Sequence, residues 1–354
     1  MKTTKNFLGD KHHVFVIAEA GSNWKSNNRK NDLKKAKKLI DLAVKSGADA
    51  VKFQTYSSEY VYVKNAGKSK YLTKTGIDKS INELFDEFSL PHNFLKHLHD
   101  YCKKKKILFM STPFSLHDAK AVDPYVDIHK IASYEINHLP LLKFIAKTKK
   151  PVIVSTGASN LVEIDFAIST LKKFGSKQIG ILQCTSKYPT SVESLNLSVI
   201  PILKKRYGLP AGLSDHSEDP TLAPLIAYGL GATILEKHFT LDKFDDGPDH
   251  FFALNPTELR DMVSKIRDAE KAYGLEKKII LKEEEELRKF AVRSIQTIKS
   301  VKKGEVFKLG KNFDILRPGN LQRGAEARFL EQIDGKIAKK SFKIGEGISI
   351  KYCK

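Results

Sequence analysis

The sequence predicts an α/β protein, a (β/α)8 TIM barrel followed by a small C-terminal β-rich domain, and three observations carry this prediction. Eight short apolar runs, rich in Val and Ile, occur within the first 250 residues. Segments of helical length separate most of these runs, and strands that alternate with helices form a parallel sheet. Every run ends in polar or charged residues, and the downstream ends of all eight strands of such a barrel meet at one mouth.

The eight expected strands each combine an apolar body with a polar end. They are residues 14–23, 50–56, 107–114, 127–135, 151–157, 179–189, 210–217 and 232–240. The expected helices carry apolar residues at helical spacing, and several begin at or near proline, which suits a first helical turn. They are residues 32–46, 91–104, 139–148, 160–174, 195–207, 220–228 and 256–273. Residues 57–90 interrupt the alternation and are expected to form a long flap over the mouth.

The character of the chain changes after residue 273, which predicts three parts. Residues 1–273 form the barrel domain, and the charged stretch GLEKKIILKEEEELRKF at 274–290 forms a linker. Residues 291–354 contain short strand-like pieces divided by turns such as KKGE and KIGEG. A domain of about 60 residues is small for a core of its own. We therefore expect it to dock on its own barrel or on that of a partner.

Composition excludes several classes of protein. Apolar residues make up 41% of the 354 residues, and no run reaches the roughly 18 apolar residues of a membrane-spanning helix. The first residues lack the apolar centre of a signal peptide. Cys102, Cys184 and Cys353 are too few and too scattered for a disulfide framework or a cysteine zinc site. We therefore expect a cytoplasmic protein with no membrane partner.

The net charge of +20 allows two interpretations. A basic chain can bind nucleic acid, or it can simply have a lysine-rich surface. Only nine of the 61 positive residues are arginine, the residue favoured for base and phosphate recognition. We therefore favour the lysine-rich surface and expect no specific nucleic-acid partner, although an anionic substrate also fits a positive field.

The eighth expected strand carries the most specific chemistry. Glu236 and His238 are two residues apart, so they point to the same side of a strand, and Lys237 points to the other. The seventh strand ends at His216, which an adjacent position would bring to the same rim. Two imidazoles with open positions suit a divalent ion such as Mn2+ or Mg2+ that also binds substrate. A buried His–Glu hydrogen bond is the alternative, and the third protein ligand that would favour zinc is not evident.

Lysines and hydroxyls at several strand ends indicate a pocket for phosphate or carboxylate. Lys52 and Lys130 end the second and fourth strands, and Ser or Thr follows at 111, 112, 133, 155, 156, 185, 186 and 214. Any one such hydroxyl is more often a cap or turn residue, but together they favour an anion site. Glu19 and Gln54 are expected to face the same cavity, where Glu19 would either pair with Lys52 or transfer a proton. Asp249 follows the last strand and would either cap a loop or bind sugar hydroxyls.

These residues also carry a resemblance to a known family. Nine motifs in order closely resemble the sialic acid synthase family: EAGSN, VKFQT, STPF, KIAS-x-E, STG, CTS-x-YP, GLSDHS, LEKHFT and GPDH. The tail, with RPGN at 317–320, resembles the antifreeze-protein-like (SAF) domain of that family. The resemblance covers almost the whole chain. It implies an enzyme that condenses phosphoenolpyruvate (PEP) with N-acetylmannosamine or a related N-acetylated amino sugar, giving a nine-carbon 2-keto acid and phosphate.

The resemblance also implies a role for each matching residue. The implied metal ligands are His216 and His238, usually for Mn2+, with Mg2+ or Co2+ possible. The implied PEP-binding residues are Lys52, Thr112, Lys130, Ser133, Ser155, Ser186 and Ser214. The implied sugar-binding residues are Gln54, Tyr188, Asp249 and Arg317, and the candidates for proton transfer are Glu19, Glu135 and Glu236. In the family the second domain covers the barrel of the other subunit, which implies a domain-swapped homodimer.

The sequence departs from the family pattern at Trp24, Gln183, Lys187 and Leu321. These departures leave the acceptor sugar open. The alternatives are a legionaminic or pseudaminic acid synthase, which uses a 6-deoxy-diacetamido acceptor, and, in another class, a non-catalytic barrel that binds or scaffolds. The flap at 57–90 and His250 are expected to bear on the choice of sugar.

Overall fold

The structure is a computed structural model that describes residues 8–26, 28–69 and 78–354. The chain divides into two compact units, Met1–Gly274 and Leu275–Lys354. Within the described residues, no helix is both long and apolar enough to cross a membrane.

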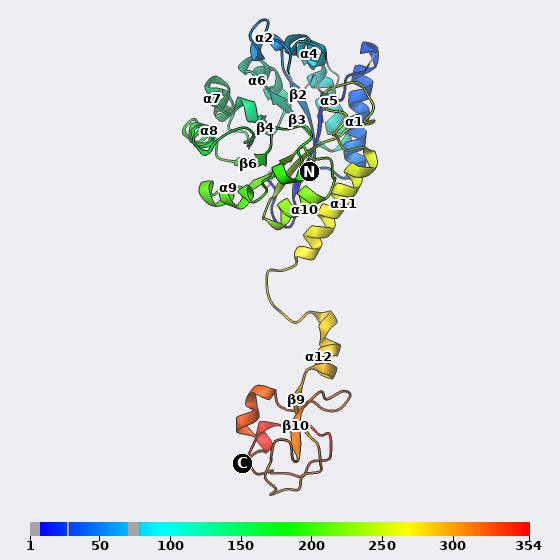
Figure 1. The fold of residues 1–354 in the computed structure, drawn as a ribbon, viewed down its shortest axis with the longest axis vertical. Helices are drawn as coiled ribbons and strands as arrows, with labels where there is room; N and C mark the ends of the chain where they lie inside the picture. The colour runs from blue at the N-terminus through cyan, green and yellow to red at the C-terminus, as the bar shows by residue number, and fades with distance from the viewer. Residues whose placement is uncertain (1–7, 27, 70–77) are drawn as a thin grey trace. The chain divides into compact units, whose positions relative to one another are not determined.

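The first unit is a barrel of eight parallel strands, which confirms the predicted fold (Figure 1). The strands are β1 (Phe15–Gly21), β2 (Ala50–Thr55), β3 (Leu108–Pro113), β4 (His129–Ile131), β5 (Val152–Ser155), β6 (Ile179–Cys184), β7 (Ala211–Asp215) and β8 (Ile234–His238). Their order in the sheet is β3-β2-β1-β8-β7-β6-β5-β4. β1 pairs with both β2 and β8, which joins the two ends of the sequence pattern. No described residue of β3 pairs in register with β4, so the barrel is nearly closed.

Helices surround the strands of this unit (Figure 1). They are α1 (Asp32–Ser46), α5 (His92–Lys105), α6 (Leu116–Val122), α7 (Leu139–Thr148), α8 (Leu161–Lys173), α9 (Val199–Tyr207), α10 (Leu222–Gly229) and α11 (Pro256–Tyr273). α8 and α11 begin with an Asn–Glu capping box, and α1 ends at Gly47, whose φ of 80° is left-handed. The sequence did not predict α6, which spans only seven residues. The expected helix at 195–207 begins later, at Val199, after a 3-10 turn at Val192–Ser194.

Alternation along the strands divides the barrel interior into an apolar layer and a polar mouth. Phe15, Ile17, Met110, Ile153, Leu182 and Ile234 belong to one buried cluster inside the barrel. Since side chains two residues apart share a face, Glu19 lies above Ile17, Lys52 above Ala50 and Glu236 above Ile234. The outward-facing residues, such as Val16 and Val51, join the larger core between the strands and the helices. This apolar layer therefore excludes water beneath the charged residues of the mouth.

The flap segment, residues 57–90, is partly helical where the structure describes it. α2 (Ser58–Val61) and α4 (Ile81–Phe88) form there, and Ser80 begins α4 with a capping box to Glu83. Residues 70–77 of the expected flap lie outside the described residues. Ile81, Leu84 and Phe88 pack with Tyr56 in a small apolar cluster of their own.

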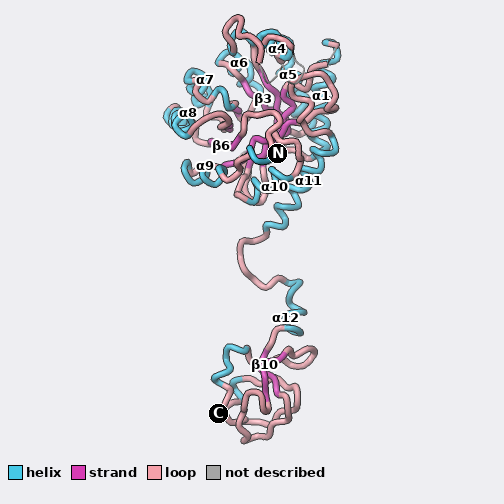
Figure 2. Tube along the Cα trace, viewed as in Figure 1, coloured by secondary structure: helices cyan, strands magenta, loops and turns pink. Residues whose placement is uncertain are grey.

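The second unit has a small core and few regular elements (Figure 2). β9 (Ser294–Thr297) and β10 (Phe313–Leu316) form an antiparallel pair, and α12 (Glu285–Ala291) covers the end of the expected linker and one residue beyond it. The other strand-like pieces pair through single bridges such as Val301 with Phe342. The core gathers Ile295, Val301, Phe307, Phe313, Ile333, Ala338, Phe342 and Ile348.

Candidate active site

A cavity of about 740 Å³ lies at the carboxyl ends of the barrel strands, and it brings together all but one of the predicted site residues. Its lining includes Glu19, Lys52, Gln54, Thr112, Lys130, Ser133, Glu135, Ser155, Ser186, Tyr188, Ser214, His216, Glu236, His238 and Asp249. The remaining residue, Arg317, lies exposed just after β10 in the second unit. The prediction that these strand ends meet is therefore confirmed, whereas the role of each residue stays a prediction.

The charged part of the cavity, which we call the floor, contains Glu19, Lys52, Lys130 and Glu236, and Lys52 contacts both carboxylates. Its Nζ lies 2.7 Å from Oε2 of Glu19 and 3.7 Å from Oε1 of Glu236, and it donates to Oγ1 of Thr112 at 2.8 Å. Gln54 donates to the other Glu19 oxygen at 3.0 Å. Burial alone would lower the pKa of Lys52, but the two carboxylates outweigh it and raise that pKa. Lys52 therefore keeps its positive charge although its side chain is buried.

Lys130 provides the second cation of the floor. Its Nζ donates to Oγ of Ser155 at 2.7 Å and lies 3.4 Å from Oε1 of Glu236. Burial lowers the pKa of Lys130, and Glu236 offsets only part of that effect. The same Glu236 oxygen accepts from Ser214 at 3.1 Å, while Oε2 of Glu236 is buried without a hydrogen bond. Lys52 and Lys130 thus share one carboxylate, and a bound anion would supply further partners for both.

Gly157 allows the hydroxyls beside Lys130 to approach the backbone. Its N–H donates to Oγ of Ser133 at 2.9 Å. A Cβ at this position would lie 2.3 Å from Oγ of Ser186 and 3.0 Å from Sγ of Cys184, so a larger residue would displace the Ser186 hydroxyl. Oγ of Ser186 is buried without a hydrogen bond. A buried hydroxyl that lacks a hydrogen-bond partner in the protein favours a ligand that supplies this partner.

The pKa values of the Glu19, Glu135 and Glu236 carboxyl groups are shifted in different directions. Burial would raise the pKa of Glu236, but Lys130 and Lys52 outweigh it and lower that pKa to about 2. Burial raises the pKa of Glu135 to about 8, and its Oε2 is buried without a hydrogen bond. Burial also raises the pKa of Glu19, against the opposing effect of Lys52. At neutral pH, Glu135 is therefore a proton donor, while Glu236 is a carboxylate.

The two histidines lie beside this floor, as the sequence predicts for neighbouring strand ends. The centroids of His216 and His238 are 5.4 Å apart. Nδ1 of His216 donates to the carbonyl oxygen of Thr185 at 2.9 Å, which leaves its Nε2 to bind a cation. Burial lowers the pKa of His238 to about 3. Burial would also lower the pKa of His216, but the Cys184 sulfur at 3.9 Å and Thr185 raise it overall.

The donor set of this pair fits a divalent cation with open positions. Nδ1 of His238 is buried without a hydrogen bond and lies 3.8 Å from Oδ2 of Asp249. Across 8–26, 28–69 and 78–354, no group of three or more His, Cys, Asp or Glu side chains is placed to hold a metal. Two imidazoles alone suit a cation that completes its shell with water and substrate oxygens, rather than a structural zinc site.

The rim on the histidine side carries the residues predicted to bind sugar. The ring of Tyr188 lies 4.2 Å from that of His216, between centroids, and 6.4 Å from that of His238. Oδ2 of Asp249 accepts from the Ser22 hydroxyl at 3.1 Å. These groups offer both a flat ring and charged acceptors next to the imidazoles.

Two of the residues that depart from the family pattern lie outside the cavity. Trp24 is buried against Phe94, with ring centroids 6.1 Å apart, and Gln183 donates to the Leu195 carbonyl at 3.2 Å. His250, which we expected to bear on the choice of sugar, is also buried away from the lining. Its Nδ1 lies 2.6 Å from Oγ1 of Thr240.

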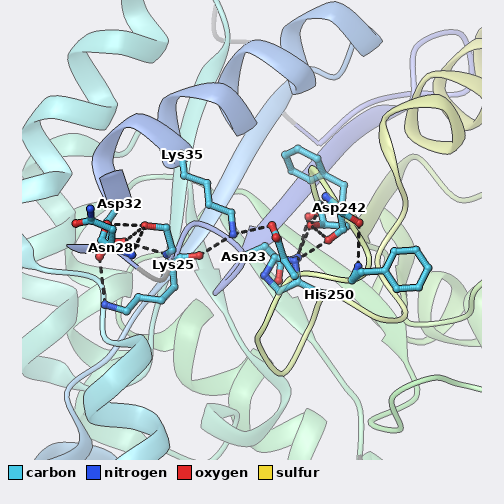
Figure 3. Close-up of polar contacts among 12 residues, drawn as sticks. Asn23, Lys25, Asn28, Asp32, Lys35, Asp242 and His250 are labelled. Atoms are coloured by element: carbon cyan, nitrogen blue, oxygen red, sulfur yellow. Dashed lines mark hydrogen bonds and ion pairs between the residues drawn. The ribbon is translucent and has the colours of Figure 1, made fainter. Parts of the chain in front are cut away.

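Polar contacts join the loops that follow β1 and β8 (Figure 3). Both loops contribute to the cavity lining, through Ser22 and Asp249. Lys35 of α1 donates to the carbonyl oxygen of Lys25 at 2.7 Å and lies 2.9 Å from Oδ2 of Asp245. Asn23 donates to the carbonyl oxygen of Phe239 at 2.9 Å. The loop that carries Asp249 is therefore tied to the first loop of the barrel.

Sequence reasoning missed an apolar part of the cavity. Tyr56, Tyr62, Phe85 and Phe114 also line the cavity, and we call these four residues the aromatic wall. The signal available in the sequence was the excess of aromatic residues within and beside the flap segment.

The fold and the cavity define the class of this protein: a (β/α)8 barrel with a charged cavity at the strand ends, where enzymes of this fold have their active sites. The sequence model of the NeuB family matches residues 39–278. The chain belongs to this family, as its motifs indicate.

Individual relatives agree with this assignment. The chain is 41% identical to the spore coat polysaccharide biosynthesis protein SpsE of Bacillus subtilis, over 92% of this chain and 89% of that one. It is 40% identical to an N,N'-diacetyllegionaminic acid synthase of Campylobacter jejuni, over 94% and 98% of the two chains. A crystal structure of an N-acetylneuraminic acid synthetase from Leptospira borgpetersenii, in complex with citrate, matches with a TM-score of 0.67 and 34% identity. That match covers 78% of this chain and 90% of the other.

Proposed function

We propose that this protein condenses PEP with the open-chain aldehyde of an N-acetylated amino sugar and water, releasing a nine-carbon 2-keto sugar acid and phosphate. The observation that carries the proposal is the meeting of two buried lysines and two histidines in one cavity. The lysine side suits the phosphate and carboxylate of PEP. The histidine side suits a cation and the oxygen of an aldehyde.

In this proposal PEP lies on the floor of the cavity. Lys52 and Lys130 pair with its charged groups, and Thr112, Ser133, Ser155, Ser186 and Ser214 donate or accept hydrogen bonds around it. Both lysines are already oriented by Thr112 and Ser155. Binding therefore needs little rearrangement, and the apolar layer beneath the floor strengthens each charge interaction.

The sugar lies above PEP, with its aldehyde next to the histidines. A divalent cation bound by His216 and His238, most simply Mn2+ with Mg2+ or Co2+ as alternatives, would supply Lewis acidity to the aldehyde oxygen. C3 of PEP forms the new carbon–carbon bond to C1 of the sugar. Water then adds to C2 of the PEP unit, and the bond from C2 to the phosphate oxygen breaks to release phosphate. Gln54, Tyr188 and Asp249 orient the sugar.

The separated pKa values of the carboxyl groups divide the proton transfers. Glu135 is protonated at neutral pH and can donate a proton to the oxygen of the former aldehyde. Glu236 remains ionised, so it stabilises positive charge that develops at C2 and keeps the two lysines in place. In this proposal Glu19, whose carboxylate pairs with Lys52, takes the proton released by the attacking water.

The acceptor is N-acetylmannosamine or a related sugar, and a legionaminic or pseudaminic acid synthase with a 6-deoxy-diacetamido acceptor is the second candidate. The 40% identity with an N,N'-diacetyllegionaminic acid synthase supports this second candidate. We also propose, from the family resemblance, that the second unit is an SAF domain that covers a partner's barrel in a domain-swapped homodimer. Arg317 would then reach the sugar's N-acyl group.

The test is release of phosphate from PEP in the presence of Mn2+ and each of several N-acetylated amino sugars. The wild-type protein should release phosphate only when a suitable sugar is present, and EDTA should abolish the release. His216→Ala and His238→Ala should each lower turnover by at least about 100-fold and weaken Mn2+ binding measured by calorimetry. His97→Ala, an exposed histidine of α5, serves as the matched control and should keep full activity.

Two results would contradict the proposal. Absence of sugar-dependent release with every acceptor would favour the non-catalytic barrel. Near-normal turnover and Mn2+ binding in the double variant His216→Ala, His238→Ala would remove the metal assignment.

A further inference from the structure

The candidate active site has two chemically different ends. Its floor gathers Glu19, Lys52, Lys130 and Glu236, all buried and charged. The cavity also has an apolar part, because the flap segment contributes Val61, Ile81, Leu84, Phe85 and Phe88 to the same lining. These flap residues pack in a cluster separate from the two barrel cores. The apolar side is therefore an addition to the barrel, rather than an exposed part of its core.

The aromatic wall is an ordered surface. The ring of Phe85 lies 4.5 Å from that of Tyr56 and 4.9 Å from that of Tyr62, between centroids. The ring of Phe114, just after β3, lies 5.2 Å from that of Tyr56. Tyr56 and Phe114 follow two strands, Tyr62 follows α2 and Phe85 lies in α4, so four segments bring these rings into one cluster.

The wall adjoins the polar groups at both of its edges. Burial raises the pKa of Tyr56 well above its ordinary value, and the nearby Asp249 carboxylate raises it further. Burial also raises the pKa of Tyr62, with a further contribution from Glu135. The wall therefore extends from the sugar side of the cavity, at Asp249, to the proposed proton donor. A sugar with its aldehyde at the histidines would place its far carbons against these rings.

This surface discriminates between sugars by what their far end carries. A hydroxyl placed against the rings of Phe85 and Phe114 loses hydrogen bonds to water and gains none from the phenyl groups. A methyl group at the same position gains from leaving water. The wall also carries two tyrosine hydroxyls, which can bind N-acyl oxygens and the remaining hydroxyls of the sugar.

We propose that the aromatic wall is a specificity subsite that selects an acceptor with a methyl group at its far end, a 6-deoxy N-acetylated amino sugar, over its 6-hydroxy counterpart. This inference rests on the proposed function, and it adds the chemical class of the acceptor and the residues that choose it. Phe85 and Phe114 are the specificity-determining residues, since they carry no polar group toward the sugar.

The test compares two matched pairs of acceptors: N-acetylmannosamine with its 6-deoxy analogue, and a 2,4-diacetamido sugar with and without its 6-hydroxyl. We expect kcat/KM for phosphate release to favour the 6-deoxy member of the productive pair by at least about 10-fold. Phe85→Gln and Phe114→Gln should each reduce that preference several-fold, while the KM for PEP stays unchanged. Phe85→Leu should keep the preference, and Phe166→Gln on the exposed face of α8 controls for the substitution itself.

The outcomes separate this inference from the proposed function. Equal or better use of the 6-hydroxy sugars would overturn the subsite and leave the proposed condensation standing. The subsite would also be overturned if folded Phe85→Gln and Phe114→Gln proteins, checked by thermal melting, lost activity equally toward both members of a pair. Absence of phosphate release with all four sugars would overturn both proposals.

Discussion

At the scale of single residues, the ionisation of each buried group depends on whether an opposite charge lies next to it. Lys52 has two carboxylates within 4 Å, whereas Glu135 has an oxygen with no hydrogen-bond partner and a pKa of about 8. Glu135 and Glu236 are both buried, and burial raises the pKa of Glu135, whereas Lys130 and Lys52 outweigh burial at Glu236 and lower its pKa. The protein thus keeps one carboxyl group neutral within the same cavity in which Glu236 is ionised.

The raised pKa of Glu135 predicts how stability depends on pH. Its pKa in the folded state lies above the unfolded value, so the neutral group favours folding at low pH. This contribution is complete below about pH 4.5 and is lost as pH rises through about 8. Glu135→Gln keeps the shape without the ionisation. We expect the variant to gain roughly 3–5 kcal/mol of unfolding free energy relative to the wild type between pH 5 and pH 9.

Denaturant unfolding of both proteins at the two pH values measures this difference. Glu193→Gln, at an exposed position, is the control and should follow the wild type at both pH values. An equal difference between Glu135→Gln and the wild type at pH 5 and pH 9 would contradict a buried neutral carboxyl group.

Some of these residue positions could be predicted from the sequence and others could not. The period of two along β8 predicted that Lys237 faces away from Glu236 and His238, and this is confirmed. Lys237 points outward, where its Nζ binds Asp215 and the Ser217 carbonyl. The sharing of Glu236 by two lysines was not predictable, because it depends on the register of β2, β4 and β8 around the barrel. Pairing of strands fixes that register, and one strand's own pattern does not contain it.

At the scale of elements, the loops after β1 and β8 act together. Lys35 in α1 contacts both loops, through the Lys25 carbonyl and the Asp245 carboxylate. Figure 3 shows it between Lys25 and the loop that contains Asp242 and His250. The second loop also presents Asp249 to the cavity. The contact of Lys35 with Asp245, outside the cavity, therefore holds the loop that carries Asp249, a proposed sugar-binding residue.

Replacing Lys35 should loosen this loop without changing the cavity floor. Lys35→Met keeps the apolar stem and removes two polar contacts, with a stability cost of about 1 kcal/mol. We expect faster amide exchange in residues 241–250 and a several-fold higher KM for the sugar, with KM for PEP unchanged. Hydrogen exchange and steady-state kinetics measure these effects.

Lys34→Met, one position earlier and exposed, is the control for that change. Unchanged exchange in residues 241–250 of Lys35→Met would show that the loop keeps its position without this contact.

Long elements with a clear period were predictable, and short ones were not. The 18 residues of α11 and the 15 of α1 have the predicted bounds. α6 and α12, with seven residues each, contain too few turns for a period to stand out. Within the flap segment, Ile81, Leu84, Phe85 and Phe88 do follow helical spacing along α4, and the prediction missed this short helix. The aromatic wall was not predictable, because it joins this helix to residues that follow β2 and β3.

At the scale of the whole molecule, each unit has a core of its own. The barrel core and the cluster around Phe307 and Phe342 share no residue. The predicted domain-swapped dimer would require the exposed Arg317 of one chain to act on the barrel of another. This assembly gives a quantitative expectation for mixed subunits.

Arg317→Ala subunits and His238→Ala subunits should each be nearly inactive alone. After unfolding and refolding as an equal mixture, half of the dimers are mixed, and one of the two sites in each mixed dimer is intact. Sugar-dependent phosphate release should then recover to about a quarter of the wild-type value. Absence of recovery, with mixed dimers verified by two affinity tags, would show that one chain builds the whole site.

The unpaired seam of the barrel has a consequence for ligand binding. Lys52 and Thr112 lie on β2 and β3, whereas Lys130 lies on β4, across the gap in the hydrogen-bonded ladder. A dianion seated on all three side chains would join the two edges of the sheet at the place where the backbone does not. Bound PEP would then connect β3 and β4, the two strands that no backbone hydrogen bond joins in the described part of the sheet. Saturation with PEP should therefore raise the melting temperature of the first unit more than that of the second.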